Sequence, residues 1–521
     1  IKEYTFNVIK QKVIENFKLA DLVEEFRGLF SLSIIKKLYD KYPSVEKIRE
    51  VIQEEPYECL CRLSGIGFKT ADQLLLTLEK ESKECEGTSK NPILHFGFDL
   101  KPSYQRAKAC VDYLLDENET NGNTYMYVGD LKKQFEILVP EAISNLPIIL
   151  KGDNDVIFDR ELLSVCRKET YETEKYIANK IKDGMSINSE WNCEYQNYTK
   201  LEGFELTEDQ KKTSEYMCKP NLAMLVGYGG AGKSSSTKAF VNMLDDYNKS
   251  YLLLAPTGRA AKVLSGYIGK EAMTIHRGLG FYPGHGWSYN EEHPLMYDVV
   301  IVDEFSMVDI FLFRRLLEAI DFNRTKLLLI GDDAQIPSVG AGNVLYDLLC
   351  YNKIPTITLN KIFRYGKGGL STIATDTRES KEYLDKSKSG MQVFGDDQSY
   401  IFMSLSQDKL VDYAVNVYQS VIKQGYDVED IALLSCYNVG DYGTVELNKR
   451  LQEAVNPDPE AKITFGDFEF RLNDIVINNV NDYKAIIYDE EYLDEDNTTF
   501  IANGESGKVV KILKDAMVAD Y

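Results

Sequence analysis

The apolar residues of this chain follow two patterns, one typical of helices and one typical of buried strands. Over residues 1–80 apolar side chains recur every three or four positions, which predicts amphipathic helices. The clearest repeats involve Ile9, Val13, Phe17, Leu22, Phe26 and Phe30. Farther along, short runs are almost entirely apolar, which predicts strands covered on both faces of a sheet. These runs are residues 225–226, 251–255, 298–302, 326–330 and a segment that ends at 359.

Breaks in these patterns divide the 521 residues into four expected domains. A helical domain is predicted for residues 1–95, and a small helical or winged domain for residues 96–200. Strands alternating with helices predict an α/β domain over residues 201–355, because that alternation is typical of parallel sheets. Residues 356–521 are expected to form a second such domain.

The net charge of −22 argues against a protein that coats nucleic acid through bulk positive charge. It does not exclude a groove in which local side chains and backbone amides hold a strand. Much of the acid is concentrated in residues 482–496, where the run predicts a solvated loop.

Composition also bears on location. No apolar run is long enough to span a membrane, and no signal peptide is visible. The nine cysteines include no CxxC pair, which indicates reduced thiols and predicts a cytoplasmic protein without a structural zinc site. Because the chain begins at Ile1 and not at Met, we expect its natural start to lie upstream.

The strongest chemical signal is a glycine-rich loop between an apolar strand and a predicted helix. Its spacing, glycine, four residues and then Gly-Lys-Ser, is the P-loop pattern. Glycines let backbone N–H groups turn toward phosphate oxygens, and the helix N-terminus adds partial positive charge. Lys233 is expected to reach the β- and γ-phosphates, and Ser234 to ligate Mg²⁺. The predicted nucleotide-binding residues are Gly227, Gly229, Gly230, Ala231, Gly232, Lys233, Ser234 and Ser235.

A glutamine lies one short helix ahead of this loop. Gln210 follows Thr207, which suits a helix N-cap, and its amide offers both a donor and an acceptor to an adenine edge. Taken alone, Gln210 is more simply interpreted as a surface residue.

Two carboxylates end the apolar strand near residue 302. Asp303 is predicted to hold Mg²⁺, and Glu304 to orient and activate the attacking water. Gln335, which follows the next strand, is predicted to touch the γ-phosphate or its water. Together with Lys233 these residues predict hydrolysis of ATP with Mg²⁺ as the metal cofactor.

Several loops are candidate DNA contacts. Strand ends in open parallel sheets are where ligands bind, so the segment from residue 256 and the turn after Gln335 can hold a nucleic-acid phosphate. The residues concerned are Pro256, Thr257, Arg259, His276, Ser338, Val339 and Gly340. For His276 the competing interpretation is a structural, hydrogen-bonded histidine. Residues 281–296 are rich in aromatic and turn-forming residues; they predict either a surface loop or a pin that stacks on bases and splits a duplex.

A Gly-Ile-Gly turn near the N-terminus joins two predicted helices, over residues 56–63 and 70–78. Gly65 and Gly67 allow a tight turn whose N–H groups face a DNA phosphate, with Lys69 nearby. This arrangement is similar to a helix-hairpin-helix element. The alternative is a packing corner without DNA contact.

Taken together, these motifs resemble a superfamily 1 DNA helicase of the RecD type. They stand in the family's order at residues 227–234, 255–261, 274–277, 303–304, 331–342 and 363–364. The group that carries an N-terminal helix-hairpin-helix domain is most similar, because residues 65–72 fit as well. The resemblance implies two RecA-like domains, the first over residues 201–355 and the second over residues 356–521, with a small β insert near residues 463–515.

The resemblance also implies a function. It implies ATP-driven 5′-to-3′ translocation on single-stranded DNA with unwinding of duplex or forked DNA. It also gives Arg364 the role of a γ-phosphate contact from the second domain. The alternative for Arg364 is an ordinary surface arginine. Two alternatives remain open: a DNA-stimulated ATPase that does not separate strands, and a nucleotide-switched DNA-binding subunit. The pathway (repair, recombination or replication), protein partners and oligomeric state are not indicated.

The chain departs from the family in two places. Tyr228 stands where the P-loop usually has glycine, and we expect it to be tolerated because this position points away from phosphate. The chain also stops at Tyr521, before the family's last motifs, which include a second arginine for phosphoryl transfer. The sequence is therefore expected to be a fragment, or else to lack competent hydrolysis.

Overall fold

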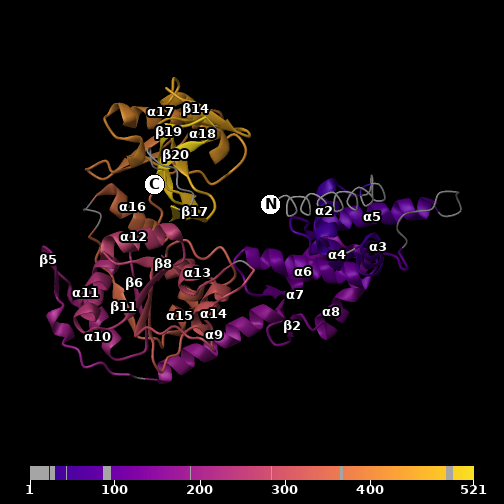
Figure 1. The fold of residues 1–521 in the computed structure, drawn as a ribbon, viewed down its shortest axis with the longest axis horizontal. Helices are drawn as coiled ribbons and strands as arrows, with labels where there is room; N and C mark the ends of the chain where they lie inside the picture. The colour runs from indigo at the N-terminus through magenta and orange to yellow at the C-terminus, as the bar shows by residue number, and fades with distance from the viewer. Residues whose placement is uncertain are drawn as a thin grey trace, which may run out of the picture. The chain divides into compact units, whose positions relative to one another are not determined.

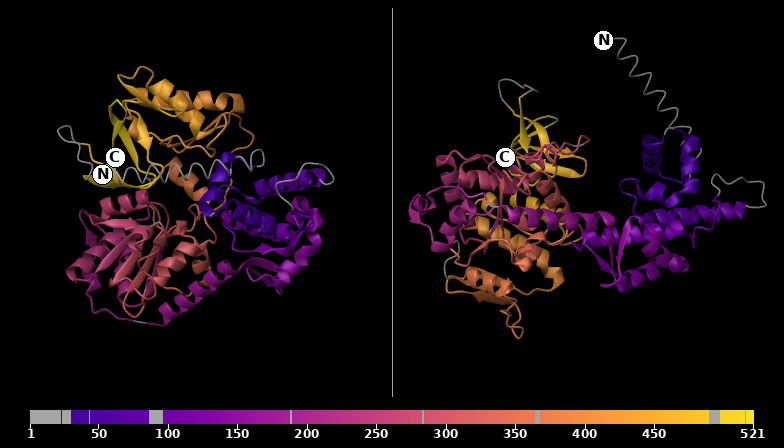
Figure 2. Two further views of the ribbon diagram at one scale, coloured as in Figure 1. Left: turned by 45° about the vertical axis from the view of Figure 1, so that its right-hand side comes forward. Right: turned by 90° about the horizontal axis from the view of Figure 1, so that it is seen from below.

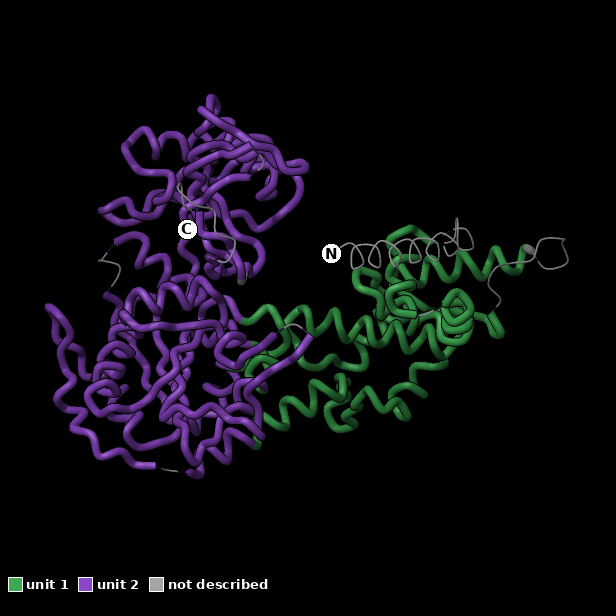
Figure 3. The backbone as a smooth tube through the Cα atoms, in the orientation of Figure 1, with its two compact units in different colours: residues 1–179, 309–314, 338–344 green, residues 180–308, 315–337, 345–521 purple. Residues whose placement is uncertain are grey.

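The computed structural model describes residues 23, 30–42, 44–85, 96–187, 189–282, 284–363, 368–488, 497–514 and 516–521. The chain forms two compact units (Figure 3). Unit 1 comprises residues 1–179, 309–314 and 338–344, and unit 2 comprises residues 180–308, 315–337 and 345–521. Among the expected helical repeats, Ile9, Val13, Phe17, Leu22 and Phe26 lie outside the described residues.

Unit 1 is mainly helical, as its apolar periodicity predicts (Figure 1). Ser31, Ser44 and Ser103 cap the N-termini of their helices by accepting a hydrogen bond from a backbone N–H, which explains where those helices begin. The helices are α2 (Leu32–Lys41), α3 (Val45–Glu54), α4 (Pro56–Cys61), α5 (Phe68–Cys85), α6 (Tyr104–Thr120), α7 (Val128–Leu138) and α8 (Leu146–Gly152). Their apolar faces share one core, which includes Ile48, Leu60, Leu75, Leu114 and Phe135.

A small antiparallel sheet completes unit 1. Its strands are β1 (Met126–Tyr127), β2 (Val156–Asp159) and β3 (Ser164–Arg167), in the order β1-β3-β2. After β3 comes the long helix α9 (Lys168–Ser186), which continues from unit 1 into unit 2.

The centre of unit 2 is a six-stranded parallel sheet in the order β11-β6-β10-β9-β7-β8. Its strands are β6 (Leu222–Gly227), β7 (Tyr251–Ala255), β8 (Ala272–Thr274), β9 (Val299–Val302), β10 (Lys326–Gly331) and β11 (Thr356–Leu359). Every residue of β6, β9 and β10 is buried, so these strands are covered on both faces, as their apolar runs predict. The short strand β8 is not evident in the sequence, because its three half-buried residues carry no such run.

Helices flank this sheet (Figures 1 and 2). They are α10 (Glu208–Cys218), α11 (Lys233–Asp246), α12 (Gly258–Ile268), α13 (Ile275–Gly278), α14 (Ile310–Glu318) and α15 (Val344–Tyr351). From β6 the chain crosses to β7, whereas from β10 it crosses to β11 on the other side of β6. Neighbouring strands that lead away in opposite directions open a crevice at their carboxyl ends, which is the usual ligand position in such sheets.

The strands described after β11 pair antiparallel. This part of unit 2 contains α16 (Gly369–Arg378), α17 (Gln407–Lys423), α18 (Thr444–Val455), β12 (Met391–Phe394), β13 (Tyr400–Met403), β14 (Lys462–Phe465), β15 (Phe468–Arg471), β16 (Ile475–Ile477), β17 (Asp482–Ile486), β18 (Thr498–Ile501), β19 (Ser506–Ile512) and β20 (Met517–Asp520). The α/β class is confirmed by the parallel sheet of the first domain. The strands from β14 onward lie where the β insert is expected, and the second RecA-like domain stays a prediction.

Among the described residues, no helix is both long and apolar enough to cross a membrane.

Candidate nucleotide and DNA site

The P-loop connects β6 to α11, and its geometry requires glycine at positions 227, 230 and 232. Gly230 and Gly232 have φ angles of 80° and 88°, a left-handed conformation that side chains disfavour. Gly232 is also the N-cap residue of α11. A Cβ on Gly227 would lie 2.5 Å from the carbonyl oxygen of Leu359, so this glycine lets β11 approach β6. Gly229 has open space around it, and Ala231 is buried.

Lys233, the first residue of α11, reaches back over the loop. Its Nζ donates hydrogen bonds to the carbonyl oxygens of Gly227, at 2.8 Å, and Tyr228, at 3.3 Å. Burial lowers the pKa of Lys233, and the carboxylates of Asp332, Glu304 and Asp303 act in the opposite direction. The ammonium group is thus held within the loop that is predicted to surround the phosphates.

The two acidic residues predicted for metal binding and catalysis follow β9. The backbone N–H of Glu304 donates to Asp303 Oδ1 at 2.9 Å, and Glu304 has a left-handed φ of 51°. Burial of the carboxylate, together with the neighbouring Glu304, raises the pKa of Asp303 to about 6. Glu304 Oε2 is buried and has no hydrogen-bond partner among the described residues. Two close carboxylates with an unpaired buried oxygen fit a divalent cation such as Mg²⁺, which oxygen ligands bind.

Ser234 and Ser235 occupy the next two positions of α11. Both are half-buried, and Ser235 Oγ lies 2.7 Å from the hydroxyl of Tyr267. Ser234 follows Lys233 at the helix N-terminus, the end of the helix where a P-loop serine is expected to face the metal.

Gln210 lies against the P-loop and is buried. It is the third residue of α10 and forms a capping box with Thr207. Its Nε2 donates to the carbonyl oxygen of Ala231 at 3.3 Å, and its Oε1 accepts from the N–H of Thr207 at 2.9 Å. The surface interpretation of Gln210 is therefore wrong: both ends of its amide contact the backbone, one of them at the P-loop. Recognition of adenine by this amide stays a prediction.

Gln335 is exposed in the turn after β10. Its N–H donates to the carbonyl oxygen of Asp332 at 3.2 Å, and Asp332 Oδ1 accepts from the N–H of Ala334 at 3.2 Å. Asp332 thus organises the turn on which Gln335 is carried. Arg364, predicted to contact the γ-phosphate, lies outside the described residues.

A different arginine is found at this edge of the sheet. Arg378, the last residue of α16, donates to the carboxylates of both Asp332 and Asp333. Its guanidinium also lies over the ring of Tyr228, 4.2 Å from the ring centroid. The sequence contains no signal for this contact, because 150 residues separate Tyr228 from Arg378 and no motif includes the arginine.

The candidate DNA segment after β7 begins α12. Thr257 caps this helix, its hydroxyl accepting from the N–H of Ala260 at 3.2 Å, and Arg259 is exposed in the first turn. Pro256 is half-buried ahead of them. The segment also lies against the turn after β18, since a Cβ on Gly258 would be 2.1 Å from the Cβ of Ala502. Contact of this segment with DNA stays a prediction.

His276 packs among aromatic rings. Its ring centroid lies 5.6 Å from that of Phe281 and 5.3 Å from that of Trp287. His276 is nevertheless exposed, and both its structural role and its contact with DNA stay predictions. Within residues 281–296, an antiparallel bridge joins Tyr282 to Gly286, and Tyr282 is 65 % exposed. Pro283 in this loop lies outside the described residues.

The turn from Ser338 to Gly340 belongs to unit 1. The Ser338 hydroxyl donates to the carbonyl oxygen of Gly342 at 2.7 Å and is buried, whereas Val339 is 83 % exposed. A Cβ on Gly340 would lie 2.4 Å from a carboxylate oxygen of Asp309, so a glycine is needed there. In this arrangement the serine hydroxyl stabilises its own turn, and the exposed group is the valine side chain.

The Gly-Ile-Gly turn joins α4 to α5 in unit 1. Gly65 has a φ of 75°, and a Cβ on Gly67 would meet no atom within 4 Å, so this side of the turn is open. The ammonium of Lys69 lies 5.2 Å from the ring centroid of Tyr113. Behind the turn, Asp72 accepts from Tyr57 Oη at 2.6 Å and from Arg106 Nε at 2.8 Å, which holds both helices to α6.

Known protein families match two regions of the chain, one around the Gly-Ile-Gly turn and one around the P-loop. A family model described as "ATP-dependent RecD2 DNA helicase HHH domain" matches residues 18–125, and one described as "AAA domain" matches residues 205–392. The ATP-dependent RecD2 DNA helicase of Deinococcus radiodurans is 29 % identical over 317 residues, which cover 61 % of this chain and 40 % of that protein. The chain is RecD-like. It carries an N-terminal helix-hairpin-helix domain, and the resemblance inferred from its motifs is confirmed in both regions.

Other relatives of this RecD-like chain are subunits named RecD. The RecBCD enzyme subunit RecD of Mycobacterium tuberculosis is 27 % identical over 281 residues, covering 47 % of this chain and 48 % of that protein. That of Haemophilus influenzae is 30 % identical over 208 residues, covering 35 % and 32 %. The chain therefore spans less than half the length of these curated relatives.

Among solved structures, the crystal structure of a Bacteroides Pif1 in complex with ADP-AlF4 matches 61 % of the RecD-like chain and 72 % of its own, with 17 % identity and a TM-score of 0.30.

Proposed function

We propose that this RecD-like chain is the nucleotide-binding and DNA-binding part of an ATP-dependent DNA helicase that moves 5′-to-3′ on single-stranded DNA and unwinds duplex or forked DNA. The observation that carries the proposal is the clustering of Lys233, Asp303 and Glu304 at one edge of the parallel sheet. There the charges of both carboxylates favour the protonated form of Lys233. The RecD2 helicase relative and the two matched family models support the same class of enzyme. The cysteine pattern supports a cytoplasmic location.

In this proposal each residue has a defined task. Backbone N–H groups of the P-loop and the ammonium of Lys233 bind the phosphates of ATP. Ser234 and Asp303 hold Mg²⁺, which when bound neutralises phosphate charge. Glu304 accepts the proton of the attacking water, a role that its unpaired buried oxygen suits. Gln335, exposed in the turn after β10, orients that water.

DNA binding is assigned to three separate loops. In unit 1, Gly65, Gly67 and Lys69 offer an open turn with a cation beside it, which suits sequence-independent contact with phosphates. In unit 2, Arg259 at the start of α12 offers an exposed guanidinium beside the helix N-terminus. Val339, in the turn from Ser338 to Gly340, offers an exposed apolar contact for a base.

The test is a strand-displacement assay with the full protein and Mg·ATP on forked duplexes. Displacement with a 5′ single-stranded tail and none with a 3′ tail supports the proposal. The reverse polarity refutes the direction of movement. DNA-stimulated ATP hydrolysis without displacement on either fork identifies a translocase, and nucleotide-dependent DNA binding without hydrolysis identifies a switched binding subunit.

A further inference from the structure

Arg378 makes three side-chain contacts and is largely buried, which distinguishes it from an ordinary surface arginine. One arm of its guanidinium bonds Asp332, the other bonds Asp333, and one face covers the ring of Tyr228 at 4.2 Å. Its side chain is 19 % exposed and that of Asp332 is 4 % exposed. A buried carboxylate is costly unless it is paired, so Asp332 depends on this partner.

Through Asp332, Arg378 is linked to the turn that carries Gln335. Asp332 Oδ1, the oxygen that Arg378 contacts, also accepts from the N–H of Ala334 at 3.2 Å. The carbonyl oxygen of the same aspartate accepts from the N–H of Gln335 at 3.2 Å. The position of the Gln335 backbone thus follows the position of Asp332.

Through Tyr228, Arg378 is linked to the P-loop. The carbonyl oxygen of Tyr228 accepts from Lys233 Nζ at 3.3 Å, and its ring supports the guanidinium. A glycine at this position, which the family usually has, would offer no ring. The face of an aromatic ring attracts a guanidinium, and the attraction is stronger where less water surrounds the pair.

We propose that Arg378 is a positioning residue of the ATPase site, with Tyr228 as its platform, that fixes the Gln335 turn relative to the P-loop. The proposal rests on the proposed function, because it assigns Gln335 to ATP hydrolysis. In this role Arg378 acts on the reaction through Asp332 and Gln335, because its guanidinium already bonds two carboxylates. Because β6 and β10 are adjacent strands, a tie between their loops spans the crevice in which the phosphates are expected.

The decisive variant is Arg378→Lys, since it keeps the charge but not the planar fork. A lysine has one ammonium group and cannot bond both aspartates while stacking on Tyr228. Asp332 remains neutralised, so Lys233 stays available to the phosphates. We expect DNA-stimulated kcat to fall about tenfold while KM for ATP changes less than about threefold, as for an interaction made only in the transition state.

A double-mutant cycle with Gln335→Ala separates positioning from a general loss of structure. If Arg378 acts through Gln335, Arg378→Lys costs less than about twofold in kcat when Gln335 is already removed. Tyr228→Leu is expected to lower kcat as well, and Tyr228→Phe, which keeps the ring, is expected to lower it less than Tyr228→Leu does. Arg450→Lys is the matched control, because Arg450 also bonds two carboxylates, those of Glu446 and Asp412, but lies exposed on α18.

The outcomes are distinguishable. Equal kcat losses for Arg378→Lys with and without Gln335 overturn the inference and leave the proposed function intact, as does a change confined to KM. A wild-type protein that hydrolyses no ATP in the presence of DNA overturns the proposed function and this inference with it.

Discussion

At the scale of single residues, the chemistry of this chain depends on charges that are partly withdrawn from water. The charge of Glu304 acts on both Lys233 and Asp303, and burial is the largest cause of the pKa shifts of these two groups. Perturbed groups that converge in a crevice are typical of a functional site. Asp112, a half-buried carboxylate in unit 1, has the same kind of pKa shift outside the predicted nucleotide site, so the shift identifies a site only together with geometry.

Glu304→Gln should abolish ATP turnover while leaving nucleotide binding nearly unchanged. The amide keeps the shape of the side chain but cannot accept the proton of the attacking water. Turnover is expected to fall at least about 100-fold, in the range usual for a lost general base. Steady-state hydrolysis and equilibrium binding of a fluorescent ATP analogue measure the two effects. Unchanged turnover contradicts the role given to Glu304.

Asp112 in α6 predicts a pH-dependent stability of unit 1. Burial raises the pKa of Asp112 to about 6, so the folded state holds its proton more tightly than the unfolded state does. The contribution of Asp112 to the free energy of unfolding is therefore lost as the pH rises from about 4 to about 6, and it is absent at higher pH. Asp112→Asn should increase the protection of α6 at pH 7.5 by about 1–3 kcal/mol, and by less at pH 5.

Hydrogen exchange of α6 peptides in the full protein, compared between variant and wild type at the same pH, measures this difference. A gain that is equal at the two pH values, or no gain, contradicts the assignment to Asp112. Asp116→Asn is a suitable control, because that carboxylate is on the same helix and is exposed.

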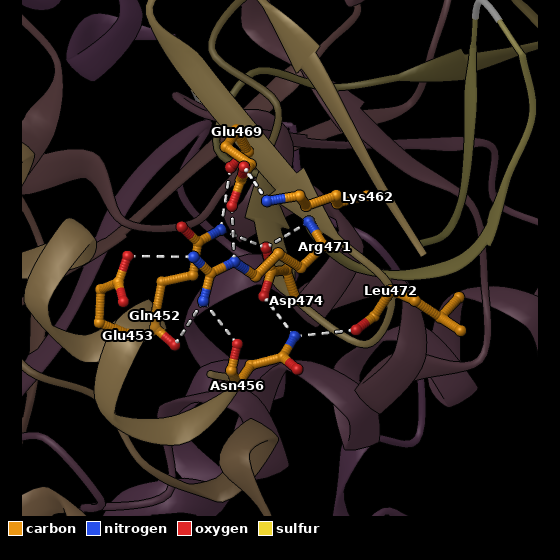
Figure 4. A network of polar contacts seen from close by, with 8 residues as sticks. All are labelled: Gln452, Glu453, Asn456, Lys462, Glu469, Arg471, Leu472 and Asp474. Atoms are coloured by element: carbon orange, nitrogen blue, oxygen red, sulfur yellow. Dashed lines mark hydrogen bonds and ion pairs between the residues drawn. The ribbon is translucent and has the colours of Figure 1, made fainter. Parts of the chain in front are cut away.

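At the scale of elements, one buried arginine ties the β structure near the C-terminus to α18 (Figure 4). Arg471 in β15 donates to the carbonyl oxygen of Asn456 at 2.6 Å, just past the end of α18, and to carboxylates of Glu453 and Glu469. Asp474 accepts from the amides of Gln452 and Asn456 and from the N–H of Arg471. The last turn of α18 is thereby capped by side chains from the following hairpin.

Arg471→Ala should loosen α18 and β15 together. The substitution leaves several acceptors without their donor, and hydrogen bonds to charged groups contribute about 1.5–3 kcal/mol each. We expect hydrogen exchange in both elements to increase by an amount equivalent to about 2 kcal/mol, without a change in β6 or β10. Lys462→Ala is the control: it removes an exposed partner of Glu469 and should cost less than about 0.5 kcal/mol. If hydrogen exchange increases in only α18 or only β15, Arg471 does not hold the two elements together.

At the scale of the whole molecule, each of the two units contains an apolar core among the described residues. One belongs to the helices of unit 1 and the other to the parallel sheet of unit 2. The elements predicted to bind nucleotide, β6, α11, β9 and β10, all lie in unit 2. Since a ligand stabilises only the part that binds it, the two cores are expected to respond differently to nucleotide.

Calorimetric unfolding of the full protein should therefore show Mg·ADP raising one transition and not the other. At a nucleotide concentration of 100 Kd the stabilisation is about 2.7 kcal/mol. Lys233→Ala should remove the shift without altering the transition of unit 1. An equal shift of both transitions would mean that the two units unfold together.

Features built by consecutive residues could be predicted from the sequence alone. A P-loop needs glycines, a lysine and a serine at fixed spacing, and a buried parallel strand needs an uninterrupted apolar run, so the strands and loops at residues 222–234 and 299–304 are predicted without tertiary information. The helix-hairpin-helix domain is recognised for the same reason, because its turn is formed by neighbouring residues.

Which distant residues meet depends on the fold. The strand order places β10 beside β6, which puts Asp332 next to the P-loop, and α16 brings Arg378 to both. A salt bridge or a stacked ring between residues 150 positions apart leaves no period or spacing in the sequence. Tyr228 illustrates the difference: the sequence identifies it as a departure from the P-loop pattern, and the tertiary structure supplies the arginine that covers its ring.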